Sequence, residues 1–229
     1  MIHKKVGIVG VGWENTIEYY RLINQGMNSH QEGYSAYECI IYALNMNEIH
    51  RIGWEKSFHI LLNACGTLKR SGVDRVVLCG HMAHLFSARL EAALDLPFIH
   101  IAFATALKLA EGNFRKVGLI GNAILTENQN YLQKFEEYGL DVILPKKTES
   151  HQFIYQLEPI DSSIKRTTIK TECSKVITDL VDKGADCLMV VTDSPQDHFQ
   201  NIAIGIPLVD ARSYHCEAIV TYIRSQINY

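Results

Sequence analysis

Short apolar runs rich in valine and isoleucine recur along the chain, separated by longer stretches with helical spacing. Runs of this length without polar alternation are typical of parallel strands that are buried on both faces. In the first half of the chain, strands are expected at Val6–Val9, Cys39–Leu44, Arg75–Leu78 and Phe98–Ile101. Strands that alternate with helices predict an α/β fold.

The stretch after the first run has the spacing of an amphipathic helix. Residues 16–27 place Ile17, Tyr20, Ile23 and Asn24 near one face. This periodicity of 3.6 residues predicts a helix rather than a strand.

Three later stretches also predict helices. Residues 55–72 carry apolar side chains at helical spacing and stop at a glycine, which favours a helix end. Residues 126–139 open with Thr126, which we expect to be the N-cap, and also close on a glycine. Residues 168–184 also predict a helix that ends at a glycine, Gly184. The polar segment between these two helices, residues 145–163, is expected to be a surface loop near the functional site.

The two halves of the chain repeat each other. Three segments of the first half return in the same order, at offsets of 110 to 112 residues: 5–10 at 116–121, 72–80 at 184–192, and 96–110 at 206–220. We therefore expect two pseudo-symmetric, Rossmann-like halves, residues 1–103 and 104–229, with the C-terminal helix able to pack across onto the first. Each half would be a mainly parallel sheet flanked by helices, with an active-site cleft between the halves.

Composition excludes several classes of protein. The net charge of −3 and the absence of a basic run argue against a nucleic acid or an anionic membrane as partner. The N-terminal apolar run is too short for a signal peptide or a membrane span, so we expect a cytoplasmic protein. Six cysteines without a C-x-x-C pair are expected to be free thiols.

Cys79 ends the predicted strand 75–78 and is followed by Gly80, His81 and His84. It could be a small core residue, a metal ligand or a reacting group. The spacing C-x-H-x-x-H contains zinc ligand types, but no second cluster completes a site, so no metal is expected. The strand end favours a reacting group, because backbone N–H groups there stabilise a thiolate and bind a carboxylate. Such a role requires that substrate can reach the thiol.

The two histidines are expected to differ. His84 is most simply explained as an interior histidine bonded to a backbone carbonyl, whereas His81, one turn earlier, is better placed to face a ligand. The glycine turn at residues 7–12 resembles a dinucleotide fingerprint, but its spacing is incomplete, and Asn45 stands where an acidic residue would end the second strand. No cofactor is therefore expected.

Five segments together resemble the cofactor-independent aspartate/glutamate racemase superfamily, and within it the aspartate racemase branch. They are "GIVGVGWENTIEYYRLIN", "VVLCGHMAH", "VGLIGN", "IYQL" at 154–157, and "IPLVDARSYHCEA". The resemblance covers almost the whole chain and implies two α/β halves around a substrate cleft, no cofactor, and a homodimer.

The resemblance also implies roles for individual residues. Family members use two cysteines on opposite faces of the substrate α-carbon, and Cys79 matches the first. Thr192 stands at the second position, where a hydroxyl donates a proton more readily than it removes one. His215 matches the family histidine near the second cysteine, and His81 and Met82 replace the family's asparagine and threonine.

These observations predict an isomerase acting at the α-carbon of aspartate, glutamate or a related small carboxylic acid. Two alternatives stay open: a one-cysteine lyase or cis–trans isomerase of the same superfamily, and a catalytically degenerate protein that binds a small acid. The candidate catalytic residues are Cys79 and Thr192, with His84 and His215 in support. The candidate substrate-binding residues are Gly12, Asn45, Gly80, His81, Met82, Asn122, Asp193 and Ser194.

Overall fold

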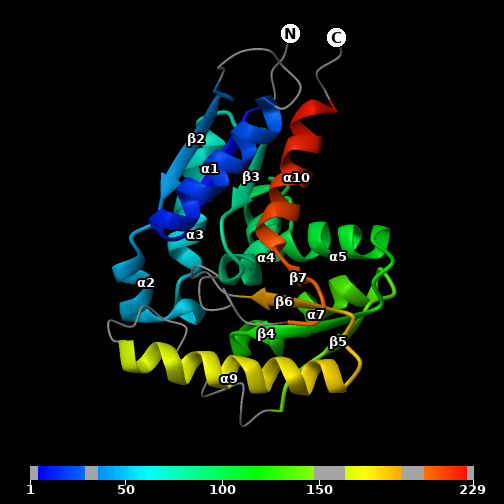
Figure 1. Cartoon of the computed structure of the whole chain (residues 1–229). Coiled ribbons are helices and arrows are strands. Elements are labelled where there is room, and N and C mark those ends of the chain that lie inside the picture. Colours follow the sequence, from blue (N-terminus) through cyan, green and yellow to red (C-terminus); the bar gives the residue numbers. More distant parts are fainter. Residues whose placement is uncertain (1–4, 29–35, 147–162, 192–203, 226–229) are drawn as a thin grey trace. The chain divides into compact units, whose positions relative to one another are not determined.

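The computed structural model describes residues 5–28, 36–146, 163–191 and 204–225 (Figure 1). The chain divides into two compact units. The first consists of residues 1–101 together with 212–229, and the second of residues 102–211. Each unit contains one parallel sheet flanked by helices, which confirms the α/β class.

The sheet of the first unit has the order β2-β1-β3, with all strands parallel. Its strands are β1 (Val6–Gly10), β2 (Cys39–Ala43) and β3 (Arg75–Leu78), as the apolar runs predict. The fourth predicted strand, Phe98–Ile101, is wrong: Phe98 forms a single parallel bridge with Val76, and a helix begins at Ile101.

Helices cover both faces of this sheet. The helices are α1 (Trp13–Asn28), α2 (Met46–Ile52), α3 (Phe58–Arg70), α4 (Ser87–Leu94) and α10 (Ala211–Arg224), with short 3-10 helices η1 (Trp54–Lys56) and η2 (Met82–Phe86). One face packs against α1 and α10, which lie side by side, and the other against α3 and α4 (Figure 1).

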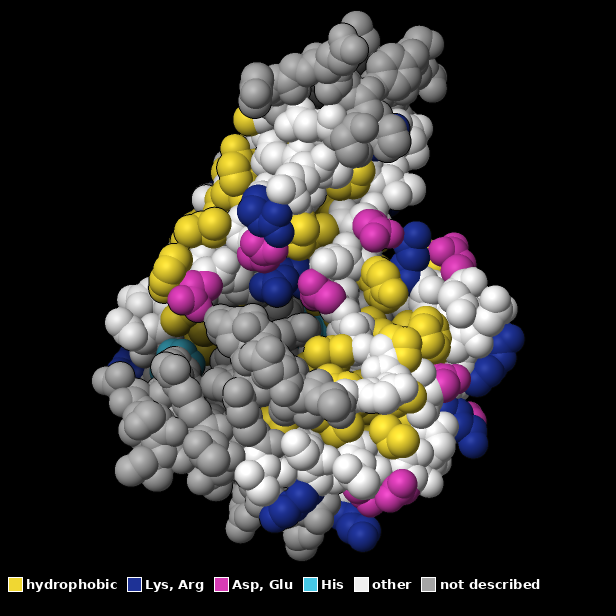
Figure 2. Space-filling model, viewed as in Figure 1, with side chains coloured by type: hydrophobic (Ala, Val, Ile, Leu, Met, Phe, Trp, Pro, Cys, Tyr) yellow, Lys and Arg dark blue, Asp and Glu magenta, His cyan; other side chains and the backbone are white. Residues whose placement is uncertain are grey.

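The buried face of α1 is only in part the one that the hydrophobic spacing suggests. Tyr19 and Ile23 pack on the sheet, whereas Ile17 is 58% exposed and Tyr20 is 37% exposed. Hydrophobic side chains also reach the surface along the edge strand β2, at Ile40. Figure 2 shows hydrophobic side chains along this edge. Helical periodicity therefore identifies the helix but not the face that is buried.

The second unit repeats the topology of the first, with strand order β5-β4-β6-β7. Its strands are β4 (Lys116–Gly121), β5 (Asp141–Ile143), β6 (Cys187–Val191) and β7 (Leu208–Val209), and its helices are α5 (Ile101–Glu111), α6 (Ala123–Thr126), α7 (Gln129–Glu136) and α9 (Ser163–Asp182). Side chains of α9 pack on one face of the sheet and form a core with β4 and β6.

Matching contacts in the two units confirm the internal repeat. A Cβ atom at Gly7 in β1 would lie 3.1 Å from Leu68 of α3, and one at Gly118 in β4 would lie 3.3 Å from Leu180 of α9. Glycine at both positions therefore lets the helix lie close to the sheet. In the first unit the Val76 N–H donates to the Pro97 carbonyl. At the matching position of the second unit the Leu188 N–H donates to the Pro207 carbonyl.

The structure confirms the helix ends predicted at glycines, but the predicted N-cap is wrong. Gly139 and Gly184 have φ values of 69° and 89°, which suit glycine after a helix. The predicted N-cap Thr126 is instead the last residue of α6, and Asn128 caps α7 by accepting from the Tyr131 N–H at 3.0 Å. Most of the predicted loop at 145–163 lies outside the described residues.

No helix in the described ranges is both long and apolar enough to cross a membrane.

Candidate active site

Cys79 follows directly on β3, at the carboxyl end of the first sheet. Its backbone N–H donates to the carbonyl of Val9 at 3.0 Å, so the sheet still holds this residue. Side chains alternate along a strand, and Cys79 shares with Val77 the face that packs against α1 and α10. Its thiol has no exposed surface and belongs to an apolar cluster with Tyr19 and Cys216. The thiol that we predicted to react is thus closed off from solvent in this structure.

The turn after Cys79 has a backbone conformation that suits glycine. Gly80 has a φ of 100°, which favours glycine. The Gly80 backbone favours the ionised form of the nearby Tyr19 phenol and so lowers its pKa slightly, against the larger effect of burial.

Tyr19 and His215 form a buried polar pair inside this apolar cluster. The Tyr19 hydroxyl lies 2.8 Å from His215 Nδ1, and His215 Nε2 lies 2.7 Å from the carbonyl of Ile99. Burial, followed by the nearby Cys216 and Cys79, raises the pKa of Tyr19 well above its usual value. Burial likewise lowers the pKa of His215 to about 3, so the imidazole is neutral at physiological pH. Sequence analysis singled out His215 but missed Tyr19.

His84 lies beside two other histidines. Its Nε2 is 3.1 Å from the carbonyl of Leu78, which confirms the expected bond to the backbone. Its ring centroid is 4.6 Å from that of His100 and 5.3 Å from that of His215. Burial, with His100 as the next cause, holds the pKa of His84 well below its usual value. In the part of the chain that the structure describes, no group of three or more His, Cys, Asp or Glu side chains could hold a metal ion.

His81 and Met82 are both buried at the start of η2. Burial, with smaller contributions from His215, His100 and Arg212, lowers the pKa of His81 to about 3. His81 is therefore a neutral hydrogen-bonding group rather than a cation.

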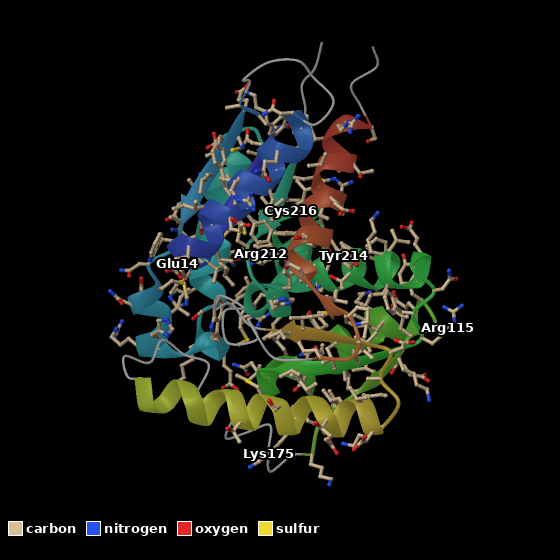
Figure 3. The ribbon with its side chains drawn as sticks, in the orientation of Figure 1. Glu14, Arg115, Lys175, Arg212, Tyr214 and Cys216 are labelled. Atoms are coloured by element: carbon tan, nitrogen blue, oxygen red, sulfur yellow. The ribbon has the colours of Figure 1, made fainter. Side chains whose placement is uncertain are left out.

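Arg212 at the start of α10 is a charged residue that the site prediction left out. Its guanidinium Nη1 lies 3.3 Å from Asn15 Oδ1 at the start of α1. Its charge also favours the ionised form of Tyr19 and the neutral form of His81, as a smaller effect than burial on the pKa of each. Figure 3 shows Arg212 and Cys216 projecting from α10 on the side of α1, and Tyr214 on the other side.

Three predicted binding residues have local structural roles. Gly12 has a φ of 73°, and its carbonyl accepts from the Thr16 hydroxyl at 2.5 Å. Asn45 caps α2 by accepting from the Asn47 N–H at 3.2 Å. Asn122 accepts from the Ile124 N–H at 2.9 Å in the same way, at the start of α6. The side-chain oxygens of Asn45 and Asn122 therefore each bond to the helix that follows in the chain.

The three predicted site residues after β6, Thr192, Asp193 and Ser194, lie outside the described residues. The structure therefore brings together Cys79, Gly80, His84 and His215 within the first unit. Tyr19 joins this group through its hydrogen bond to His215 and its packing in the cluster that contains Cys79.

Solved structures with the same fold include racemases and a decarboxylase. A Yersinia pestis protein provisionally named an Asp/Glu racemase is 28% identical, with a TM-score of 0.80 over 96% of this chain and 99% of that one. An aspartate racemase homologue from Pyrococcus horikoshii OT3 is 22% identical, with a TM-score of 0.75 over the same shares. Arylmalonate decarboxylase shares the fold at 12% identity, with a TM-score of 0.52 over 98% of this chain and 94% of that one.

The family model for Asp/Glu/hydantoin racemase matches residues 8–219, which cover most of the first unit, all of the second and every candidate residue. The resemblance in the sequence motifs and the repeated fold agree with this match. The chain belongs to the Asp/Glu/hydantoin racemase family.

Proposed function

We propose that this chain is a cofactor-independent isomerase that inverts the α-carbon of aspartate, glutamate or a related small carboxylic acid. Cys79 is the base, and Thr192 donates a proton to the opposite face. The observation that carries the proposal is the place of Cys79, directly after β3 at the carboxyl end of a parallel sheet. Ligands of open parallel sheets bind at this end of the strands. Membership of a racemase family supports the reaction class.

In the proposed reaction the Cys79 thiolate takes the α-proton, which leaves a carbanion and a thiol. The Thr192 hydroxyl then gives its proton to the other face of the carbanion and becomes an alkoxide. Water returns a proton to the alkoxide and takes one from the thiol, so protons balance over a cycle. Because an alkoxide is a much stronger base than a thiolate, we expect turnover to be slow or strongly one-directional.

The burial of Cys79 sets a condition on this mechanism. The thiol has no exposed surface, so substrate can reach it only when the packing around it opens. The carboxylate is proposed to bind the backbone N–H groups of Gly80, His81 and Asn122, together with Ser194. We expect a charged carboxylate to bind such N–H groups well, because charge-assisted hydrogen bonds are the stronger ones.

Deuterium incorporation tests the proposal directly. The protein is incubated in D₂O with D- and L-aspartate and with D- and L-glutamate, and loss of the α-proton signal is followed by NMR. Cys79→Ala should abolish the exchange. Cys65→Ala is the matched control, because Cys65 is equally buried in the first unit but packs on the α3 face of the sheet. No exchange with any of the four acids would contradict the amino-dicarboxylate assignment.

A one-cysteine lyase is the second candidate, favoured by the threonine at position 192 and by the fold shared with arylmalonate decarboxylase. In that reaction a carbanion left by loss of carbon dioxide takes its proton from Cys79, and no opposite-face donor is needed. Release of carbon dioxide from a small malonate would identify it. Thr192→Cys should increase racemisation only if the rest of the site is competent for that reaction. Failure of this gain, together with a Cys79 inert to iodoacetamide, would favour a protein that only binds a small acid.

A further inference from the structure

Exposed apolar side chains form a strip along one edge of the first unit, on α1 and β2 (Figure 2). On α1 the strip contains Trp13, Ile17 and Tyr20, of which Trp13 is 72% exposed. On β2 it contains Ile40 and Ile41, of which Ile41 is 41% exposed. We call these five residues the apolar strip. With about 200 Å² for a fully exposed large side chain, they present roughly 500 Å², which is large for the surface of a monomer.

Two contacts of α1 show that its part of the strip lies on the side of β2. On one side of the helix, Asn24 Oδ1 accepts from the N–H of Tyr37, two residues before β2, at 2.7 Å. On the other side, Tyr19 bonds to His215 of α10. The strip residues of α1 precede Asn24 by four, seven and eleven residues, a spacing that places them on its side of the helix. The helix and strand parts of the strip are therefore neighbours.

The strand part lies on an edge of the sheet. Ile41 is in register with Ile8 of β1, whose side chain packs in the cluster beneath α1. Ile41 therefore points to the face that α1 covers, and Ile40 points to the opposite face. Among the described strands, β2 pairs with β1 alone, so its other side is open for pairing. The strand sequence CIIYA contains no charge and no proline, the residues with which edge strands avoid such pairing.

The charges beside the strip are balanced. Lys5 Nζ lies 2.9 Å from Glu38 Oε1 next to β2, and Arg21 Nε donates to Glu18 Oε2 at 2.8 Å on α1. Glu14 lies at the start of α1, beside one end of the strip. A surface that faces its own copy requires such a balance, because charges of one sign would repel each other. A nucleic acid or an anionic membrane would instead require an excess of Lys and Arg.

We propose that the apolar strip is the interface between two copies of this chain, related by a two-fold axis at β2. An axis perpendicular to the sheet pairs β2 antiparallel with β2 of the second copy and joins the two sheets into one. Both α1 helices then cover the same face and run antiparallel, so that their parts of the strip meet. This inference goes beyond the proposed function and does not depend on it.

The area and the charges of the strip both fit such a dimer. A standard interface buries about 800 Å² on each partner, and about 65% of a homodimer interface is apolar, so roughly 500 Å² of apolar surface is what each copy has to supply. The strip on α1 is centred near Ile17. A two-fold axis there brings the start of one α1, with Glu14, toward the part of the other α1 that carries Arg21. The two charges are opposite, as an interface between copies requires.

Sedimentation velocity over a range of concentrations tests the proposal. The unmodified protein should sediment at twice the mass of one chain. Ile41→Lys should raise the dimer dissociation constant at least about a hundredfold, because two like charges then meet at the axis. Ile124→Lys is the matched control, since Ile124 is 42% exposed but lies in the second unit, and it should leave the dimer intact.

Three results of this experiment would overturn the proposal. One is an unmodified protein that is monomeric at every concentration. Another is a dimer that Ile41→Lys and Ile124→Lys weaken equally. The third is a monomer that binds vesicles of phosphatidylcholine and phosphatidylserine and loses this binding in Ile41→Lys, which would assign the strip to a membrane.

Cross-linking tests the position of the axis. Directly opposed residues of antiparallel strands have α-carbons about 4.5–5.5 Å apart, a separation that a disulfide spans. Ile41→Cys, made together with Cys39→Ser to remove the neighbouring thiol, should therefore form a covalent dimer on mild oxidation. Ile124→Cys in the same Cys39→Ser protein should remain monomeric on a denaturing gel. Equal cross-linking of the two variants would contradict an axis at β2.

Amide hydrogen exchange of the unmodified protein covers the case in which the variants do not fold. In the dimer, the β2 amides that face away from β1 are paired, so they should exchange slowly. Dilution to the monomer should accelerate their exchange at least tenfold and leave Val77 in β3 unchanged. A dimer whose β2 amides exchange as fast as those of the monomer would overturn the proposal.

Discussion

The hydroxyl of Tyr19 and Nδ1 of His215 lie 2.8 Å apart, although 196 residues separate them in the chain. This bond joins α1 to α10 and completes the first unit with residues from the C-terminal end of the chain. It lies in a cluster that also buries Cys79, with apolar side chains of β1 and β3 around it. The bond therefore couples the packing of two helices to the surroundings of the proposed base.

Buried histidines should make the stability of the protein depend on pH. Burial lowers the pKa of His81 and of His215 to about 3 and holds that of His84 well below normal. Above pH 6.5 each histidine is neutral in both the folded and the unfolded state, so none makes the stability depend on pH. Below pH 6.5 the unfolded chain binds protons that the folded protein does not, and stability falls. We expect a loss of up to about 1.4 kcal/mol per pH unit for each histidine.

Urea unfolding at pH 7.5, 6.5 and 5.5 measures this dependence. His215→Gln should be less stable than the unmodified protein at pH 7.5, because it disturbs the bonds to Tyr19 and Ile99. Its unfolding free energy should nevertheless fall less steeply with decreasing pH, because one histidine fewer takes up a proton on unfolding. An unfolding free energy that stays constant from pH 7.5 to pH 5.5 would rule out neutral buried histidines.

Two glycines at the ends of corresponding strands should resist substitution by alanine. A Cβ atom at Gly10 would lie 2.5 Å from Thr16 Oγ1, and one at Gly121 would collide with the carbonyl oxygen of Val191. The Thr16 side chain can rotate away, whereas the Val191 backbone belongs to β6 and cannot. We expect losses of about 1–2 kcal/mol for Gly10→Ala and about 3 kcal/mol for Gly121→Ala. Gly205→Ala, with open space around it, is the control and should be nearly neutral in thermal unfolding.

The fold could be read from the sequence because its evidence is local and is repeated. Strands buried on both faces have a composition of their own, and the second copy of each motif confirms the first. The predictions are wrong where contacts between distant parts of the chain determine which side chains are buried. Ile17 and Tyr20 have the apolar spacing of a buried face, but His215 of α10 offers a buried partner to Tyr19, and the helix turns that side inward. No local pattern reports a partner 196 residues away.

The candidate site was only partly predictable for the same reason. A strand that ends in a cysteine and a glycine identifies Cys79, and strand alternation then determines the face on which its thiol lies. Its complete burial depends on how α1 and α10 pack, which the strand itself does not encode. Asn45 and Asn122 follow strands as binding residues do, but an asparagine before a helix also caps it, and the two roles look alike in a sequence.

The cap of α7 can be tested by one pair of asparagines. Asn128 Oδ1 accepts from the Tyr131 N–H at 3.0 Å, whereas Asn130 is exposed within the first turn of the helix. Asn128→Ala removes the cap and should lower the unfolding free energy by about 1 kcal/mol. Asn130→Ala should leave it unchanged or slightly higher, because alanine favours a helix interior. Equal effects of both variants in urea unfolding would mean that the helix starts elsewhere.

Corresponding aspartates before β3 and β6 should contribute to stability in both units. Asp74 Oδ2 accepts from the Lys5 N–H at 2.7 Å, and Asp186 Oδ2 accepts from the N–H groups of Arg115 at 2.7 Å and Lys116 at 3.1 Å. Each carboxylate thereby fixes the entry to the central strand of its sheet. Replacement by alanine leaves these N–H groups without their charged acceptor, and water can replace the carboxylate only in part. We expect a loss of about 1 kcal/mol for Asp74→Ala and about 2 kcal/mol for Asp186→Ala, since the second carboxylate accepts two bonds.

Hydrogen exchange separates this local effect from a general loss of stability. The Lys116 amide should exchange faster in Asp186→Ala but not in Asp74→Ala, because the two aspartates act on different sheets. Asp182→Ala is the control, since Asp182 is exposed at the end of α9, where loss of a negative charge is neutral or slightly stabilising. If Asp74→Ala and Asp186→Ala accelerated exchange equally in both sheets, the two units would unfold together and the aspartates would not act locally.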